Sequence, residues 1–542
     1  MPTPGDMGGR APTQIGGDMP PAGGVRVKHG RSLASVTLML LLSLTAVQSV
    51  ALNASSPAWD WPLRGVSLPV RPMVEPASGN LRFDSIDVAI PGKGFALEIQ
   101  RVYNSRSGHR GVFGHGWSSN LDVQARNSGK KTVEVVEADG SVIRYYASAQ
   151  KGKQGDPTFT SAAFPQATLV RLSAGGYERR TGSVLVETFG RDGYLREVRD
   201  AYGNVLTIVR TAGRLEAVRN NSGRALAIQT DAEGRVTAVS DPLGRTWTYG
   251  YDAAGDLVLS SAPGRGKTLL TYDRLHNLER IVYPDGARQE LGYDPVRDVV
   301  LTAHGPGDDL SRFEYRLTDG AGGEVTVFDG SGNRTRHVRS SLPSGSELTL
   351  TDAQGGSRRK LFDVFGNLLE SVDEKGNRTR FRYDECHRLT ARADPEGNTW
   401  RYEYSDRDCS CRTVTAETRP DGTRQEYRRD ARGALVGQTD ASAIDSEVSY
   451  EEFGLPAQVR NEIEGTVTYR YNREGDLVGL SVEGGTEVQF ERDVVGRLTG
   501  VTVPGADRVR FTYDDADQLT RTAVGDRVRT YSQGMKARLG LA

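Results

Sequence analysis

The chain has 542 residues, of which 26% are charged, with 69 basic against 70 acidic side chains and a formal net charge of −1. This balance argues against a nucleic-acid or anionic-membrane partner, because such partners select for a basic excess. The 64 glycines and 23 prolines indicate many turns, and three cysteines are too few for a disulfide framework in so long a chain. We therefore expect a large, turn-rich protein with a hydrophobic core of its own.

Residues 1–54 are predicted to be an N-terminal extension and signal peptide. Three basic residues within 26–31 precede an uncharged, mostly apolar run over 32–52, and Ser49-Val50-Ala51 supplies the small residues that signal peptidase recognises. We expect cleavage near Ala51 or Ala54. An uncleaved anchor is the alternative, since about 20 apolar residues can span a bilayer. In both cases the rest of the chain is exported, to be secreted or held at the cell envelope, and this segment is the only predicted membrane contact.

Two segments lie between the signal peptide and the repeats. Residues 55–146 carry a sequence that is not repeated elsewhere, and we expect a small β-rich domain that plugs or caps one end of the fold. Residues 147–185 are punctuated by glycine and proline, which predicts a loop-rich connector. In the first segment, His109 and His115 flank a glycine-rich loop that could hold a ligand or a metal. No carboxylate or thiol accompanies them at ligand spacing, so we predict no metal site there.

A repeat of about 21 residues occupies residues 186–533 and leaves a short tail at 534–542. Its clearest copies carry the phrase aromatic-x-Tyr-Asp-x-x-Gly-x-Leu, and the last four anchor glycines follow one another at steps of 21 residues. The anchor glycines are Gly193, Gly213, Gly234, Gly255, Gly366, Gly433, Gly454, Gly475 and Gly496. A fixed period of this length indicates stacked copies of one supersecondary unit.

The repeat continues where the glycine is replaced. His276, His387 and Asp517 stand in its place, and histidine and aspartate tolerate the positive φ of a tight turn better than bulkier residues do. We therefore assign the motif a structural role. Its representative residues are Tyr251, Asp252, Gly255, Tyr272, Asp273, Tyr383, Asp384, Gly475, Tyr513 and Asp514.

Each unit is predicted to be two strands and two turns. Paired aromatics at alternate positions share one strand face, and we expect them to form an inward-facing, dry ladder; the pairs are Phe313/Tyr315, Phe381/Tyr383, Tyr402/Tyr404, Tyr469/Tyr471 and Phe511/Tyr513. Asp accepts backbone amides in the first turn, and Asp-Pro-x-Gly or Pro-Asp-Gly makes the second. Aliphatics three apart on the outgoing strand, such as Leu278 and Ile281, predict a β-bulge. The expected fold is all-β, with tandem hairpins that coil into a β-shell, complete or open.

These phrases resemble the YD repeat of bacterial rearrangement-hotspot (RHS) proteins and of the animal teneurins. Upstream, Arg101-Val102-Tyr103-Asn104-Ser105 and Phe113-Gly114-His115-Gly116-Trp117 resemble the domain that commonly precedes such repeats in bacterial RHS proteins. The resemblance implies a hollow β-shell that encapsulates a C-terminal toxin or forms a large cell-surface module. The family's Pro-x-x-x-x-Asp-Pro-x-Gly signature, linked to self-cleavage, is not found, since Asp241-Pro242 and Asp394-Pro395 lie inside ordinary repeats. No toxin activity or self-cleavage is therefore assigned to any residue.

Several further motifs are interpreted as structural. Residues 264–268, Gly-Arg-Gly-Lys-Thr, resemble a phosphate-binding loop, but Ser261 stands where that motif needs glycine and a strand follows instead of a helix. Cys386, Cys409 and Cys411 cluster in consecutive repeats, where we expect a local disulfide or free thiols rather than zinc. We predict no catalytic, cofactor-binding or metal residues, and no cofactor.

Two function classes remain open. The first is an exported, non-catalytic scaffold related to toxin encapsulation, whose partner would be a toxin payload or an immunity protein encoded nearby. The second is an extracellular binding or adhesion module whose aromatic rings contact glycans or cell surfaces. A hydrolase is a less favoured third class, because the aspartates recur with the repeat instead of gathering in one site.

Overall fold

A computed structural model describes residues 73–76, 78–151, 156–182, 184–305, 310–317, 323–405, 414–440, 442–463 and 465–531. Within these ranges every regular element is a β-strand, as predicted. No helix in the described part of the chain is long and apolar enough to cross a membrane. The predicted signal peptide and the tail at 534–542 lie outside the described residues.

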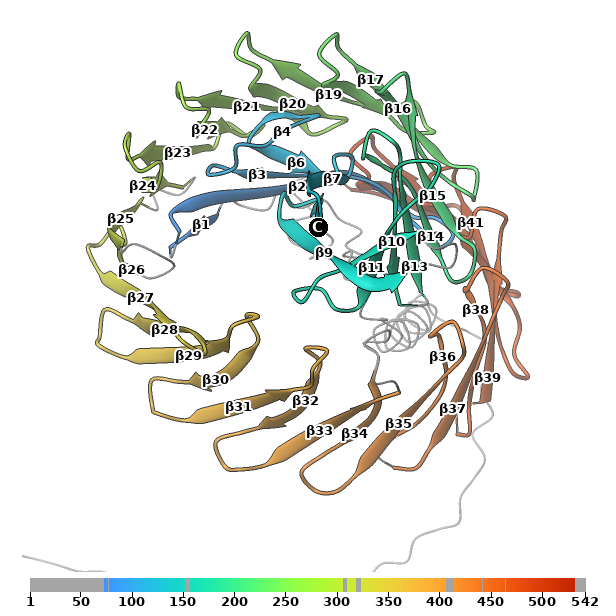
Figure 1. The fold of residues 1–542 in the computed structure, drawn as a ribbon. Helices are drawn as coiled ribbons and strands as arrows, with labels where there is room; N and C mark the ends of the chain where they lie inside the picture. The colour runs from blue at the N-terminus through green and yellow to red at the C-terminus, as the bar shows by residue number, and fades with distance from the viewer. Residues whose placement is uncertain are drawn as a thin grey trace, which may run out of the picture. The chain divides into compact units, whose positions relative to one another are not determined.

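The N-terminal strands form a small unit that we call the plug, residues 73–123. It consists of an antiparallel sheet in the order β1-β2-β3-β6 and a separate hairpin, β4-β5. The strands are β1 (Met73–Glu75), β2 (Asn80–Ile90), β3 (Leu97–Asn104), β4 (Arg110–Gly111), β5 (Gly114–His115) and β6 (Trp117–Ser119). The plug lies inside the curve of a much larger sheet (Figure 1).

That larger sheet, which we call the wall, is one antiparallel run from β7 to β45 in which neighbours in sequence pair. Its first strands are β7 (Gln124–Gly129), β8 (Thr132–Val136), β9 (Val142–Lys151), β10 (Pro157–Thr160), β11 (Ala167–Arg171), β12 (Tyr177–Thr181), β13 (Leu185–Phe189), β14 (Leu195–Asp200), β15 (Val205–Thr211), β16 (Arg214–Asn220), β17 (Ala225–Thr230), β18 (Val236–Ser240) and β19 (Thr246–Tyr251). The middle strands are β20 (Leu257–Ala262), β21 (Gly266–Tyr272), β22 (Leu278–Val282), β23 (Arg288–Tyr293), β24 (Val300–His304), β25 (Leu310–Leu317), β26 (Gly323–Phe328), β27 (Arg334–Leu342), β28 (Gly345–Thr351), β29 (Ser357–Asp363), β30 (Leu368–Val372), β31 (Arg378–Tyr383) and β32 (Leu389–Ala393). The last strands are β33 (Thr399–Tyr404), β34 (Val414–Thr418), β35 (Arg424–Arg429), β36 (Leu435–Thr439), β37 (Asp445–Tyr450), β38 (Pro456–Asn461), β39 (Gly465–Tyr471), β40 (Leu477–Val482), β41 (Val488–Arg492), β42 (Leu498–Thr502), β43 (Val509–Tyr513), β44 (Leu519–Val524) and β45 (Arg527–Thr530).

Two predicted segments do not coincide with the division of the chain into sheets. The predicted N-terminal domain at 55–146 includes strands β7–β9, yet these strands belong to the wall. The segment 147–185, predicted as a loop-rich connector, contains β10, β11 and β12 and the start of β13. Its glycines mark hairpin turns and not a long loop: Gly175 and Gly176, with φ of 90° and 87°, lie between β11 and β12. The shell therefore begins at Gln124, well before the first recognisable repeat.

A β-bulge recurs in the outgoing strands and bends the wall. In the β21–β22 pair, Thr271 lies opposite Arg280 and Tyr272 opposite Leu278, which leaves Glu279 as the extra residue. The same shift occurs at Gly250/Tyr251, Arg382/Tyr383 and Thr512/Tyr513. Because one residue is inserted, Leu278 and Ile281 face the same side although they are three apart, as predicted.

The bent wall winds past its own beginning. We call the Asp-x-x-Gly turn after each tyrosine the YD turn and the turn at the other end of the unit the second turn. Second turns within residues 200–265 contact YD turns within residues 451–517, and we call this contact the seam. Asn204 Nδ2, for example, donates to the carbonyl oxygen of Phe453 at 2.9 Å, across 249 residues.

The most buried ion pair of the seam joins Arg224 to Asp476. The guanidinium Nη2 lies 2.6 Å from the carboxylate Oδ2, and the two side chains are only 3% and 5% exposed. Arg224 also donates to the carbonyl oxygens of Pro91 in the plug and Val494 in the next YD turn, both at 2.8 Å. One side chain thus connects the plug, an early second turn and two late YD turns.

The wall also meets itself close to its start. The backbone N–H of Ala125 donates to Gly193 O, and that of Leu195 donates to Val123 O, both at 2.9 Å. The first strand, β7, is therefore fixed to the turn between β13 and β14. The shell is a wound sheet held by these contacts and by the seam, and it is not a barrel closed by pairing its two ends.

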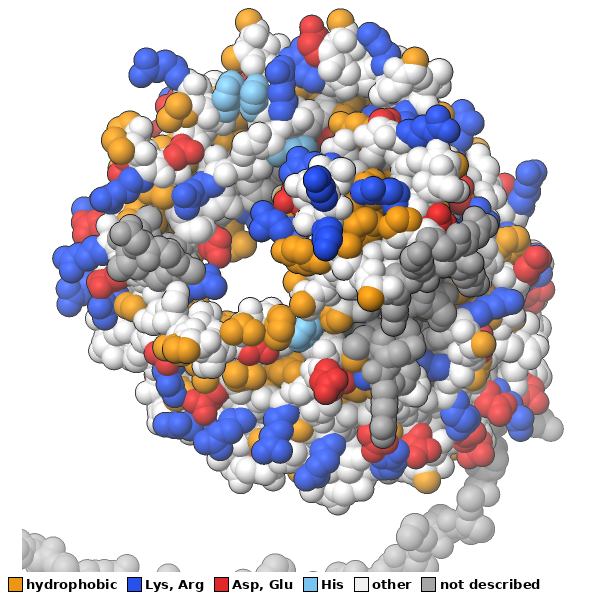
Figure 2. Space-filling model, viewed as in Figure 1, with side chains coloured by type: hydrophobic (Ala, Val, Ile, Leu, Met, Phe, Trp, Pro, Cys, Tyr) orange, Lys and Arg blue, Asp and Glu red, His pale blue; other side chains and the backbone are white. Residues whose placement is uncertain are grey.

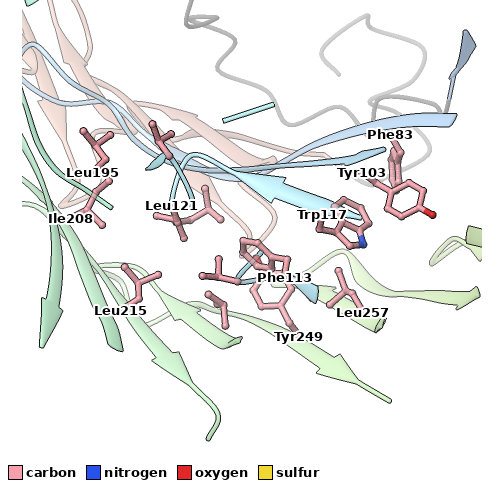
Figure 3. Close-up of a cluster of buried hydrophobic side chains, with 14 of the residues drawn as sticks. Phe83, Tyr103, Phe113, Trp117, Leu121, Leu195, Ile208, Leu215, Tyr249 and Leu257 are labelled. Atoms are coloured by element: carbon pink, nitrogen blue, oxygen red, sulfur yellow. The ribbon is translucent and has the colours of Figure 1, made fainter. Parts of the chain in front are cut away.

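The main core lies between the plug and the early part of the wall (Figure 3). Phe113 of the plug and Tyr249 of the wall meet edge to face, with ring centroids 5.0 Å apart. The cluster contains side chains of both units. They are Phe83, Tyr103, Phe113, Trp117 and Leu121 from the plug, and Leu195, Ile208, Leu215, Tyr249 and Leu257 from the wall. The plug is therefore not an independent domain, because its core is completed by the wall.

Replacing Asp476 with asparagine should destabilise the protein by about 3–5 kcal/mol, because Arg224 would keep a buried charge without its counter-ion. Urea unfolding followed by tryptophan fluorescence would measure this loss. The matched control is Asp445→Asn, which breaks an exposed pair with Arg428 (33% and 45% exposed, 2.8 Å) and should cost less than about 1 kcal/mol. Equal effects of the two substitutions would show that the seam pair does not stabilise the winding.

Candidate functional site: the inner face of the wall

The face of the wall that carries the repeat tyrosines points inward. Tyr249 Oη donates to Asp87 Oδ2 of the plug at 2.7 Å, and Trp117 Nε1 donates to Tyr272 Oη at 3.0 Å. Because the plug lies within the curve of the wall, these tyrosines define the concave side (Figure 1). Successive residues of a strand point to opposite faces, so the intervening side chains point outward.

Strand β31 shows this alternation clearly. Arg378, Arg380 and Arg382 are exposed, whereas the alternating Thr379, Phe381 and Tyr383 are half-buried. Arg-carboxylate pairs recur on the charged outer face, including Arg359–Glu347, Arg424–Glu403 and Arg470–Glu487. In Figure 2, charged side chains gather around the outside of the wall and hydrophobic side chains border the central opening. The chemistry of the two faces is therefore different.

The repeat tyrosine links consecutive units through its hydroxyl group. Tyr513 Oη donates to the carbonyl oxygen of Leu498 at 2.8 Å, fifteen residues earlier. The same bond, at 2.7–3.0 Å, is made by Tyr251 to Val236, Tyr293 to Leu278, Tyr315 to Val300, Tyr404 to Leu389 and Tyr450 to Leu435. The sequence pattern predicts only a packing role for these rings. The constant spacing of 15 between the tyrosine and an aliphatic residue was the signal for the bond.

The aromatic ladder faces inward, but it is not dry along its whole length. Tyr383, Tyr471 and Tyr513 are each half-buried. Burial raises the pKa of all three hydroxyl groups. The ladder is dry where the plug covers the wall, because there the rings pack against a second layer, and two later rings, Tyr469 and Phe490, are also buried. At Tyr383, Tyr471 and Tyr513 the rings stay partly accessible.

The aspartate and glycine positions of the motif act as turn residues. Asp252 Oδ1 accepts the backbone N–H groups of Gly255 and Asp256, both at 2.9 Å. Equivalent bonds are made by Asp273, Asp384 and Asp514. The fourth turn position has a positive φ whether it is glycine or not: 93° at Gly255, 89° at Gly475, 67° at His276, 59° at His387 and 63° at Asp517. The turn aspartates are therefore occupied by amides, and the histidines are tolerated turn residues.

The plug docks on the inner face through residues of the two motifs that precede the repeats, at 101–105 and 113–117. Arg101 Nε lies 2.6 Å from Asp87 Oδ2, its Nη2 donates to Ser260 Oγ at 3.0 Å, and its guanidinium carbon lies 4.6 Å from the Trp117 ring centroid. Tyr103 Oη donates to His276 O and accepts from the N–H of Leu278, both at 2.9 Å. These residues fix the plug to two consecutive repeats, through strand β20 of one and the YD turn and strand β22 of the next.

The side chains of the inner face become more polar where the plug ends. Beneath the plug its rows hold fully buried aliphatics such as Leu270 and Ile281. In β29–β36 the equivalent positions hold Lys360, Arg392, Glu417 and Gln438. Together with the half-buried rings of Trp400 and Tyr402, we call these four residues the polar window. Sequence reasoning missed the window, although the replacement of aliphatic by charged residues at fixed repeat positions was a visible signal.

Charges and rings lie close together in the polar window. The guanidinium carbon of Arg392 is 5.0 Å from the centroid of the Trp400 ring, within the range of a cation–π contact. Burial raises the pKa of Tyr402, Glu417 raises it further and Arg392 opposes the shift. The window thus offers aromatic faces, both signs of charge and an amide, which suits hydrogen bonding and stacking with a bound polypeptide or sugar.

The other motifs singled out in the sequence are a phosphate-loop-like segment and three cysteines. Gly264 and Arg265 lie in a second turn that leads into β21, as predicted. Cys386 is disulfide-bonded, whereas Cys409 and Cys411 fall in 406–413, outside the described residues. In the part of the chain that the structure describes, no group of three or more His, Cys, Asp or Glu residues could hold a metal ion. Burial in the plug raises the pKa of the Glu98 carboxyl group to about 7.

Comparison with known proteins agrees with this architecture. Residues 72–145 match a domain of unknown function, DUF6531, and residues 231–268 and 362–399 match the RHS Repeat family. The chain is 31% identical over 315 residues to a protein of Dickeya dadantii named "Probable deoxyribonuclease RhsB"; the match covers 55% of this chain and 20% of that protein. This chain thus spans about a fifth of the length of that relative.

Two solved structures align with most of the chain, at low identity and low TM-score. A crystal structure of TcdB2-TccC3-TEV has 14% identity and a TM-score of 0.36, covering 92% of this chain and 30% of that one. A Photorhabdus luminescens Tc holotoxin pore has 13% identity and a TM-score of 0.33, covering 83% of this chain and 26% of that one.

Removing the hydroxyl group that links two repeats should lower stability modestly. Tyr513→Phe leaves the Leu498 carbonyl without this donor, and we expect a loss of about 0.5–1.5 kcal/mol in urea unfolding. The control is Tyr202→Phe, because the Tyr202 hydroxyl is buried without a hydrogen-bond partner among the described residues and its removal should be neutral or slightly stabilising. If both variants lose the same free energy, the loss comes from packing and not from the bond.

Proposed function

Because the chain is an RHS/YD-repeat protein, we propose that it is an exported, non-catalytic shell that encloses a polypeptide cargo. The observation that carries the proposal is the polar window, which lies on the inner face beyond the plug. A wall that only completed a core would be mostly apolar there, as it is beneath the plug, where Leu270 and Ile281 are fully buried and Gln289 is a polar exception. A wall that faces a hydrated cargo needs polar side chains, because these can hydrogen-bond to water when the cargo is absent.

The chemistry of the window suits a polypeptide. Arg392 and Glu417 can pair with side chains of either charge, Gln438 can bond a peptide group, and the ring of Trp400 offers an apolar face. Contacts of this kind are individually weak in a half-exposed setting, so a guest would be held without being trapped. Enclosure then comes from the wall, and affinity from many small contacts.

The arrangement gives little support to catalysis by the shell itself. The motif aspartates, the most frequent acidic residues of the repeat, accept turn amides and are committed to folding. The similar protein of Dickeya dadantii carries the name of a deoxyribonuclease, but this chain spans only a fifth of it. We therefore leave that activity with that protein and assign this chain the role of container.

The orientation of the rings separates this proposal from a surface adhesion module. An adhesion module would present aromatic rings to the outside, where a glycan could stack on them. Here the outer strand faces carry arginines paired with glutamates, and the repeat aromatics point inward. The inward arrangement favours an enclosed guest over a cell-surface ligand.

A protease-protection assay tests enclosure. An unstructured reporter peptide fused after Ala542 should resist digestion while the shell is folded and should be cleaved quickly when the shell is denatured. Asp476→Asn should speed cleavage, because it weakens the seam, whereas the control Asp445→Asn should not. A reporter cut at the rate of the free peptide in the wild-type fusion would refute enclosure, and glycan binding by the same protein would then support the adhesion module.

The proposed export predicts that the signal peptide is removed from the N-terminus. Mass spectrometry of the protein made in a bacterial host should find a mature chain that begins just after Ala51 or Ala54, in the periplasm or the medium. An intact N-terminus in the membrane fraction would indicate the uncleaved anchor. An intact N-terminus in the cytoplasm would contradict export.

A further inference from the structure

Two histidines meet face to face where the plug touches the wall. His115 is the last residue of β5 in the plug, and His276 lies in the YD turn between β21 and β22. Their rings are 3.7 Å apart at the centroids and only 8° from parallel. This stack is a direct contact between the β4-β5 hairpin and the wall.

The turn itself does not require a histidine at position 276. Its φ of 67° is the left-handed conformation that glycine adopts at the same position of other repeats, for example Gly255. Glycine has no steric cost there, whereas a side chain is mildly strained. The imidazole of His276 therefore contributes contacts that a glycine would not provide.

The charges around the two rings are unequal. His276 Nδ1 lies 2.9 Å from both carboxylate oxygens of Asp256, whose side chain is 3% exposed. Asp256 is close enough to His115 to favour its charged form as well, but its oxygens are hydrogen-bonded to His276. On the His115 side lie the positive Arg110 of β4 and, near Gly255, the guanidinium of Arg235. A proton on His115 is thus disfavoured from two sides, by the guanidinium groups and by the His276 ring, which already occupies both Asp256 oxygens.

We propose that the stacked pair His115–His276 is an acid-sensitive latch between the plug and the wall. At neutral pH the uncharged ring of His115 stacks on His276. Under acid conditions His115 gains a proton, which places an imidazolium ion at stacking distance from His276 and close to Arg110. The Asp256 carboxylate is already hydrogen-bonded to His276 and compensates this new charge only weakly, so the β4-β5 hairpin is released from the turn.

The direction of the pH dependence follows from the state that binds the proton. Burial lowers the pKa of His115 below its ordinary value of 6.5, His276 and Arg110 lower it further, and Asp256 opposes the shift. The docked hairpin therefore binds fewer protons than the free one, so docking is strongest above pH 6.5 and weakens as the pH falls below it. Glu98 acts in the opposite direction, because its raised pKa of about 7 makes burial less costly in acid.

Neither metal binding nor simple packing accounts for the pair as well as the latch does. A metal ion would need ring nitrogens that converge on one point, whereas parallel stacking presents ring faces to each other. Simple packing would be served by any flat ring, and it would leave the buried carboxylate of Asp256 without the Nδ1 contact. The combination of stack, one carboxylate and two nearby guanidinium groups is what makes the contact depend on protonation.

Hydrogen–deuterium exchange on the full-length protein tests the latch. Amides of residues 110–116 should lose protection by about tenfold between about pH 7.5 and about pH 5, after correction for intrinsic exchange. Amides of β41–β44 should not change over the same range, which distinguishes local release from unfolding of the wall. An unchanged hairpin would overturn the proposal.

The chain supplies a matched pair of variants. His276→Gly removes the stack and relieves the strained φ, so the hairpin should lose its pH dependence while the turn stays folded. His387→Gly makes the same change in another YD turn, where the histidine ring contacts Phe365. In this variant the β4-β5 hairpin should respond to pH as it does in the wild type. Persistence of the pH response in His276→Gly would refute the latch. The assay does not involve a cargo, so its outcome is independent of the enclosure proposal.

Discussion

One extra residue in the outgoing strand is the constraint on which this architecture depends. The bulge that leaves Glu279 unpaired between Leu278 and Arg280 recurs next to the repeat tyrosine along the wall. Each bulge adds twist to a sheet that would otherwise be flatter. The accumulated bend returns the chain to its own beginning 252 residues later, where Arg224 meets Asp476. Without this bend there would be no seam, no concave face and no space to enclose.

Local features of this fold could be predicted from the sequence because they repeat. The positive φ at His276 and His387, the bulge and the all-β class all follow from residues within one unit of 21. The pairing of Arg224 with Asp476 could not be predicted, because the two residues are 252 positions apart and neither carries a distinctive local pattern. The strands of 147–185 were missed because their glycines look the same in hairpin turns as in loops.

The candidate site was predicted less completely than the fold. The tyrosines were expected to face inward, and they do, but the hydrogen bond from Tyr513 to Leu498 was not foreseen. The polar window was missed because Lys360 and Arg392 look like ordinary surface residues until their repeat positions are aligned with Leu270 and Ile281. A charged residue is informative here only when the face on which it lies is already known.

The seam joins early second turns to late YD turns through side chains and turn carbonyls. It therefore fixes the number of repeat units between them. Arg224 lies in a second turn, and Asp476 lies in a YD turn 252 residues further along the chain. Loss or gain of one whole unit between them would move every late turn by one place against its early counterpart and mismatch all seam contacts at once. Units added beyond β45 would leave this phase intact. Evolution of such a shell can therefore lengthen it at the end more easily than in the middle.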